Sequence, residues 1–146
     1  MSKSSFLIQL LTPQQTHDLW SDLEPLLQQA CAANDIAKQD LTPESIYNRI
    51  MDDDCGVVLG RKDDKPAIVL VLQFIQMGNR KGASFLALAG SDLLQFKALY
   101  WDMILEWLRD GLGVKFIEAY ASDRLATIYQ NKFGFDTSCR YVRKNL

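Results

Sequence analysis

The chain has 146 residues, of which 48% are hydrophobic and 23% charged, and its formal net charge is −2. This length suits a single domain, residues 1–146, with a sizeable core. The charge gives no general attraction to nucleic acid or to anionic lipid. No apolar run approaches the ~20 residues that a membrane-spanning helix needs, and residues 1–5 lack a signal-peptide pattern. We therefore expect a cytoplasmic protein with no nucleic-acid partner and no membrane partner.

The cysteine and histidine content argues against a metal site. Cys31, Cys55 and Cys139 are far apart in the sequence and fit neither a zinc spacing nor a disulfide framework. This usage favours a reducing compartment. Because the chain has one histidine, we also expect no histidine-based metal centre.

The first third of the chain predicts one strand and two helical regions. Residues 6–11 form a short apolar run and predict the first strand. Thr-Pro pairs at 12–13 and 42–43 predict helix starts, since threonine can cap and proline at the first helical position gives up only an unpaired N–H. Pro25 interrupts the first apolar pattern and predicts a kink or a split there. The polar residues 34–41 predict a loop.

The middle of the chain predicts the centre of a sheet. Residues 57–61 and 67–77 flank a turn-rich connection and predict a β-hairpin. Residues 67–72 are apolar at every position, which is typical of a strand covered on both faces, so we expect this strand at the centre of the sheet. Residues 83–89 predict the fourth strand.

The last third predicts a crossover followed by two further strands. Helical spacing after Ser91 ends at two glycines, and then come a strand at 114–121, a helix at 124–133 and a final strand at 135–143. The order β-α-α-β-β-β-α-β-α-β predicts an α/β protein whose mixed sheet has helices on both faces, with the fourth and fifth strands parallel. One core is expected to contain Trp20, Leu70, Leu72, Leu86, Ile104, Ile117 and Phe135.

A short motif adds a family resemblance. Ala126 and Tyr129 precede the pair Gly134-Phe135, and this pattern, together with the element order, resembles the GNAT superfamily of acyl-CoA-dependent N-acyltransferases. The resemblance implies that Tyr129 is the general acid that protonates the departing thiolate of coenzyme A. The alternative interpretation makes Tyr129 an ordinary helix residue that covers the sheet.

The glycine-rich loop of such enzymes is absent. That loop holds the cofactor pyrophosphate through backbone N–H groups at the start of the long helix. The corresponding residues 92–97 contain no glycine, and the carboxylate of Asp92 would repel phosphate. We therefore expect either no cofactor or weak acetyl-CoA binding. With a shifted alignment, the residues that would hold the cofactor are Leu88, Gly90, Ser91 and Gln95.

The resemblance also implies a general base for the acceptor amine. Glu118 lies in the fifth predicted strand between Ile117 and Ala119, and burial between these residues would make it a stronger base. The alternative is a strand-end charge in solvent, or one paired with Lys115 or Arg124.

Two functions follow from these observations. The chain's ending resembles GNAT-like phage and prophage proteins with an eroded phosphate loop. The first hypothesis is therefore a non-catalytic, virion-associated or accessory protein of the host cytoplasm or virion, which acts through a protein partner or self-association. The second is an active acyltransferase that transfers acetyl to an amine and has a divergent loop.

Overall fold

The computed structural model describes residues 6–32 and 39–146. Five strands form one sheet in the order β1-β2-β3-β4-β5. Their bounds are β1 (Phe6–Leu11), β2 (Cys55–Lys62), β3 (Lys65–Met77), β4 (Arg80–Gly90) and β5 (Phe116–Ala119). The strands from β1 to β4 pair antiparallel, and β5 pairs parallel with β4. The predicted central position of β3 and the predicted parallel pair are both confirmed.

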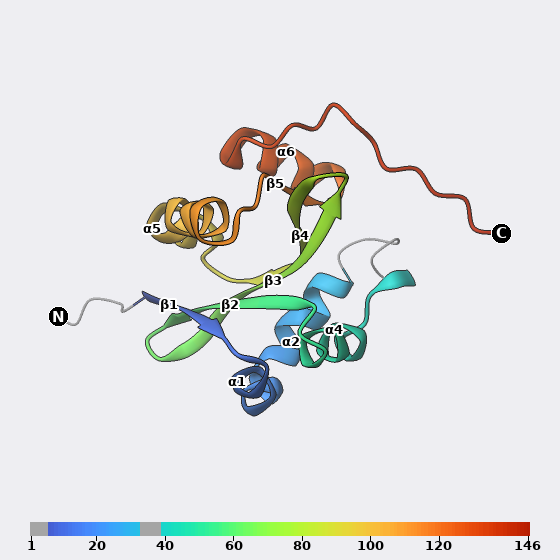
Figure 1. Cartoon of the computed structure of the whole chain (residues 1–146). Helices are drawn as coiled ribbons and strands as arrows, with labels where there is room; N and C mark the ends of the chain where they lie inside the picture. Colours follow the sequence, from blue (N-terminus) through green and yellow to red (C-terminus); the bar gives the residue numbers. More distant parts are fainter. Residues whose placement is uncertain (1–5, 33–38) are drawn as a thin grey trace.

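Helices cover both faces of the sheet, as expected (Figure 1). On one face lie α1 (Pro13–Asp18), α2 (Trp20–Cys31) and α4 (Pro43–Met51). On the other lie α5 (Leu93–Glu106), its π-helical continuation η1 (Trp107–Gly111), and α6 (Asp123–Phe133). Within the described residues, no helix is both long enough and apolar enough to cross a membrane.

The Thr-Pro pairs begin helices as predicted. Of the two alternatives at Pro25, a kink or a split, the split is wrong, because α2 is continuous through this residue. Thr12 and Thr42 each cap a helix in a reciprocal capping box. The first helical region divides at Leu19, between α1 and α2, and Pro25 lies inside α2. Leu23 and Leu27 of α2 are fully buried, and this packing outweighs the local cost of the proline. Of the loop expected at 34–41, residues 34–38 lie outside the described part, and residues 39–40 are helical, so the loop prediction is wrong there.

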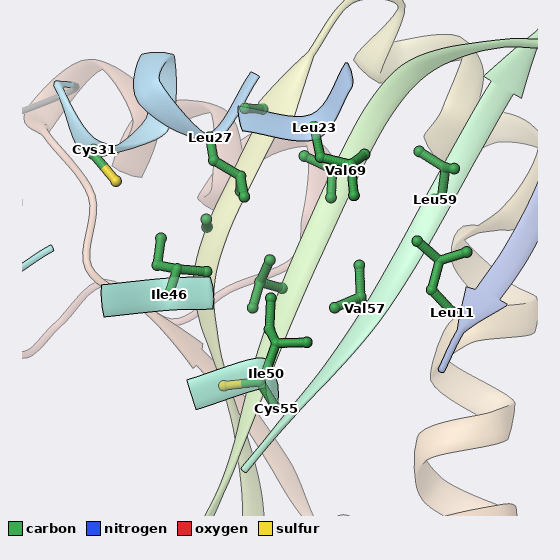
Figure 2. Packing of buried hydrophobic residues seen from close by; sticks show 13 residues of the cluster. Leu11, Leu23, Leu27, Cys31, Ile46, Ile50, Cys55, Val57, Leu59 and Val69 are labelled. Atoms are coloured by element: carbon green, nitrogen blue, oxygen red, sulfur yellow. The ribbon is translucent and has the colours of Figure 1, made fainter. Parts of the chain in front are cut away.

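The described residues form two hydrophobic clusters, one on each face of the sheet, so the expectation of a single core is wrong. Alternate residues of β3 point to opposite faces. Val69 and Val71 therefore join the cluster under α2 and α4, against which Trp20 and Leu86 also pack (Figure 2). The other five expected core residues lie in or against the cluster under α5 and α6; they are Leu70, Leu72, Ile104, Ile117 and Phe135.

The final strand predicted at 135–143 is also wrong. Residues 134–146 form neither helix nor strand, and residues 136–146 are exposed. β5 is shorter than the predicted 114–121, and its ladder runs along β4 alone. A segment with strand-like composition needs a partner strand for its backbone hydrogen bonds. Within the described residues the last segment has none.

The positions of the three cysteines lead to a labelling prediction. Cys31 and Cys55 are buried and Cys139 is exposed; burial raises the pKa of the Cys55 thiol to about 11 and also raises that of Cys31. Since the thiolate is the reactive form, iodoacetamide at neutral pH should modify the folded chain at Cys139 alone. Mass spectrometry should then find three modified sites after unfolding in guanidinium. Rapid labelling of Cys31 or Cys55 in the folded chain would contradict this burial.

Candidate functional site

A bulge in β4 marks the place where the two parallel strands separate. Val71 faces Ala87 and Leu72 faces Phe85 across the β3–β4 ladder, so Leu86 is an extra residue in β4. A bulge bends its strand and increases the local twist. β5 pairs with Gly82 to Phe85, on the near side of the bulge. The remainder of β4 leads, without a β5 partner, to the N-terminus of α5.

Gly90 and Ser91, two of the residues expected to hold the cofactor, lie against β3 at the end of β4. Gly90 has φ +129°, and a Cβ there would lie 2.1 Å from the carbonyl oxygen of Ala67. The backbone N–H of Ser91 donates to that same carbonyl at 2.9 Å. Because the Ser91 N–H already donates within the protein, it is not available to a pyrophosphate. A cofactor-binding role for Gly90 and Ser91 stays a prediction.

Asp92 places a negative charge at the positive end of α5. Its backbone is left-handed, with φ +61°, and its carbonyl accepts the backbone N–H of Phe96 at 2.9 Å, which starts the helix. Its Oδ2 lies 3.2 Å from Nζ of Lys62, and the two side chains are 35% and 34% exposed. The carboxylate therefore neutralises the lysine that could otherwise attract phosphate here.

Asp92 is visible in the sequence as a charge at this helix start, but its partner Lys62 is not. Lys62 lies 30 residues earlier, at the end of β2, and no motif links the two positions. Of the other expected cofactor residues, Leu88 is half-buried against the cluster under α5. Gln95 is exposed on the first turn of α5, where its side chain is free to meet a ligand.

Tyr129 lies among aromatic rings. Its side chain is 8% exposed, and its ring centroid is 5.1 Å from that of Phe135 and 5.8 Å from that of Phe133. The ring centroids of Phe133 and Trp101 are 4.8 Å apart. Those of Trp101 and Phe85, on β4, are 5.9 Å apart. Burial raises the pKa of Tyr129, so its hydroxyl is protonated at neutral pH. Both interpretations of Tyr129, proton donor and packing residue, are compatible with this setting.

A cavity of about 410 Å³ lies beside β5, next to this aromatic cluster. Trp101, Phe133 and Phe135 of the cluster line this cavity, whereas Tyr129 does not. The structure therefore does not place Tyr129 and Glu118 on the walls of one cavity. The residues that line it are Trp101, Leu105, Ile117, Glu118, Ala119, Phe133, Gly134, Phe135 and Asp136.

The burial expected for Glu118 is wrong. Ile117 and Ala119 pack against the cluster under α5 and α6, so the alternation of the strand turns Glu118 to the opposite face. There its side chain is exposed, and it forms an ion pair with neither Lys115 nor Arg124. Of the two alternatives, the exposed strand charge is the one that the structure supports.

The described residues contain no group of three or more His, Cys, Asp or Glu side chains that could hold a metal ion. The run Asp52 to Asp54 follows α4, where Asp53 adopts a left-handed conformation with φ +62°. This geometry is that of a turn.

No protein-family model and no curated protein matches the sequence. Solved structures do match the fold. A predicted acetyltransferase from Clostridium acetobutylicum, solved with acetyl-CoA, has a TM-score of 0.64 at 12% identity, covering 97% of this chain and 96% of that one. An aminoglycoside antibiotic 6'-N-acetyltransferase from Acinetobacter baumannii has a TM-score of 0.66 at 12% identity, covering 97% and 99%.

A GNAT family acetyltransferase from Staphylococcus aureus has a TM-score of 0.63 at 17% identity, again covering 97% of this chain and 99% of that one. The likeness extends over nearly the whole length of both chains in each comparison. The chain therefore has the GNAT fold, as the order of its elements and its Gly-Phe motif predict.

Proposed function

We propose that this chain is a GNAT-fold protein whose acyl-CoA site is eroded, and that it acts through protein contacts rather than by acyl transfer. The observation that carries the proposal is the Asp92–Lys62 pair at the N-terminus of α5. A phosphate at that point would have to displace one carboxylate and approach a helix start without glycine.

The surroundings of this pair support the proposal. The backbone N–H of Ser91 already donates to the carbonyl of Ala67. It is therefore not available to bind a phosphate. The exposed Glu118 is a poor general base, because a base needs a setting that holds it against the substrate amine.

The proposed contact role is supported by exposed apolar side chains. Leu99 and Met103 lie one helical turn apart on α5 and are 52% and 55% exposed, and Leu10 of β1 is 51% exposed. Leu10 and Met103 line a groove of about 180 Å³ between β1 and α5. Exposed apolar side chains that gather at a groove are typical of interaction sites. The virion-associated form of this role rests on the resemblance of the C-terminus to phage and prophage proteins.

A thiol-release assay tests the non-catalytic proposal. The chain is incubated with acetyl-CoA and a panel of primary amines, and free coenzyme A is measured with a thiol reagent. Because the exposed Cys139 would itself react, the assay uses Cys139→Ser. We expect no release above the rate without protein. Release that is saturable in acetyl-CoA would contradict the proposal.

The second candidate, an active N-acyltransferase, is favoured by the position of Tyr129. It lies on α6 in a buried setting that keeps its hydroxyl protonated, as a proton donor to a leaving thiolate must be. In the release assay, this candidate predicts activity that Tyr129→Phe lowers by about 10²–10⁴-fold. The non-catalytic proposal predicts the same background for both proteins.

A further inference from the structure

β1 lies at an edge of the sheet, and the register of the strands shows which of its backbone groups face outward (Figure 1). The N–H of Ser91 donates to the carbonyl of Ala67, so the backbone of Ala67 points toward β4. In an antiparallel ladder, successive residues direct their backbone groups alternately to the two sides. When this alternation is followed through β3 and β2 to β1, the backbone groups of Phe6, Ile8 and Leu10 point away from β2.

Two of these three residues have outward backbone groups without a partner. The hydroxyl of Tyr100 on α5 donates to the carbonyl of Phe6, which agrees with the outward direction and covers one end of the edge. Within the described residues, neither Ile8 nor Leu10 forms a backbone hydrogen bond outside the β1–β2 ladder. A strand edge of this kind is a template for another strand.

The apolar groove of about 180 Å³ follows this part of the edge. Ile8 and Leu10 line it from β1, and Met103 and Trp107 line it from α5 and η1. Val58 of β2, which also lines the groove, is 4% exposed. A strand added beside β1 would direct every second side chain to this face of the sheet. Apolar side chains at those positions would lie over the groove.

The outer side of α5 next to the groove is acidic. Glu106 lies three residues from Met103, on the same side of the helix, and Asp102 lies one turn before Glu106. Both carboxylates are exposed, and within the described part of the chain neither forms an ion pair. The nearby Arg109 is bound to Asp110 at 3.0 Å. Since like charges four residues apart and acidic groups toward a helix C-terminus both weaken a helix, these carboxylates do not stabilise α5. They would attract a cationic partner.

The same charges disfavour a second copy of this chain as the partner. Antiparallel pairing of two β1 edges about a two-fold axis would bring both α5 helices to the same face of the joined sheet. Asp102 and Glu106 of one copy would then lie on the same side as those of the other, and like charges oppose association. A basic segment meets no such repulsion.

We propose that the β1 edge and its groove bind an extended basic segment of another protein. A large apolar side chain of this segment enters the groove, and lysine or arginine two residues to either side meets Asp102 and Glu106. Residues two apart in a strand share a face, which sets this spacing. Hydrogen bonds to the backbones of Ile8 and Leu10 supply affinity, and the side chains supply specificity. The inference rests on the contact role proposed above and names its class of partner.

Fluorescence anisotropy with a labelled synthetic peptide tests the binding. The probe is Ser-Lys-Val-Leu-Val-Lys-Ser, blocked at both ends, and it is titrated with the full chain. We expect saturation with a dissociation constant below about 100 μM. Replacing both lysines of the peptide by glutamate, or its leucine by serine, should weaken binding about tenfold or more. A probe that binds no better than these two control peptides would overturn the proposal.

Two variants of the chain locate the binding site. Asp102→Asn combined with Glu106→Gln removes both charges at nearly constant size, and should weaken binding about fivefold and reduce its dependence on salt. Leu10→Pro removes an outward N–H and leaves the ladder to β2 intact, whereas the control Leu10→Val keeps the N–H. The proline variant should bind about tenfold more weakly than the control. Binding that neither change affects would place the peptide elsewhere and disprove the site.

Amide hydrogen exchange tests the added strand itself. In the free chain the N–H groups of Leu7 and Gln9, which face β2, should exchange slowly, and those of Ile8 and Leu10 should exchange fast. The bound peptide should slow exchange at Ile8 and Leu10. If exchange there is unchanged while the peptide is bound, no strand is added at β1 and the proposal is wrong.

Two further outcomes separate this inference from its alternatives. The binding mixtures contain no acetyl-CoA, so saturable thiol release in the assay described above would overturn the non-catalytic role and leave the peptide result to be judged by itself. Failure of the peptide to bind, without thiol release, would overturn this inference alone. Sedimentation of the free chain tests self-pairing: a dimer that Leu10→Pro dissociates and Leu10→Val does not would make a second copy the occupant and contradict the proposal.

Discussion

Gly90→Ala should destabilise the protein by on the order of 3 kcal/mol or more. Gly90 joins β4 to α5 with φ +129°, and an added Cβ would lie 2.1 Å from the carbonyl oxygen of Ala67 and 2.6 Å from the Cα of Ile68. Neither atom can move without breaking the pairing of β3 and β4. Urea unfolding followed by circular dichroism measures the free energy of unfolding.

Gly78→Ala is the matched control for this prediction. Gly78 also has a positive φ, +61°, but an added Cβ would meet nothing within 4 Å. It should cost only the backbone strain of a left-handed alanine, roughly 1–2 kcal/mol. Equal losses for the two variants would mean that the close approach of Gly90 to β3 is not what requires glycine there.

The second large effect is expected in the cluster under α5 and α6. Leu70 and Ile104 are 1% and 2% exposed, one on β3 and the other on α5, and both belong to this cluster. Truncating either to alanine leaves a cavity in a tightly packed region, so each should cost on the order of 2–5 kcal/mol. Val142→Ala, at a position that is 85% exposed, should change the free energy of unfolding by less than about 0.5 kcal/mol.

Chemical denaturation of the three variants measures these effects. Because Leu70 and Ile104 lie in one cluster, their double variant should show a loss that differs from the sum of the two. An unchanged midpoint for Leu70→Ala or Ile104→Ala would mean that the faces of β3 and α5 have been assigned wrongly.

Much of the fold could be predicted from the sequence because its strongest signals are local. The run at 67–72 is apolar at every position, and such a strand has to be covered on both faces. Two Thr-Pro pairs begin helices through capping boxes that involve residues three apart. The core divides into two clusters because alternate residues of a strand point to opposite faces of the sheet. Knowing which residues are apolar does not by itself reveal this division.

The final strand was not predictable in the same way. Residues 135–143 have a suitable composition, but a strand exists only where another strand supplies its hydrogen bonds. β5 ends at Ala119 and the chain after α6 stands across a cavity from it. Whether that partner is present depends on the arrangement of two distant elements and not on the segment itself.

The sequence predicts the acidic charge at the candidate site, but it does not predict which residues contact one another there. The glycine-free stretch and the acidic Asp92 are visible in the sequence, and both bear on phosphate binding. The pairing of Asp92 with Lys62 and the use of the Ser91 N–H by Ala67 join residues that only the hairpin and the sheet bring together. Glu118 was expected to be buried because its neighbours are apolar, but β5 lies at the edge of the sheet, where this argument fails.

Asp92→Asn offers a way to separate the charge of the site from its shape. Asparagine tolerates the left-handed backbone of this position, so the fold should be retained while Lys62 loses its partner. If the Asp92 carboxylate opposes phosphate by about 1 kcal/mol per nearby charge in solvated surroundings, then the variant should bind acetyl-CoA more tightly than the wild type, by about fivefold or more. Equal affinities of the variant and the wild type for acetyl-CoA would show that the Asp92 carboxylate does not weaken binding.

The most direct test of the central claim, that the acyl-CoA site is eroded, is a calorimetric titration of acetyl-CoA into the wild-type chain. The Asp92–Lys62 pair and the absence of glycine from 92–97 together oppose the convergence of backbone N–H groups on a pyrophosphate. We predict no saturable heat below about millimolar ligand. Saturation at one site per chain with a dissociation constant in the micromolar range would contradict the claim and would favour an active acyltransferase.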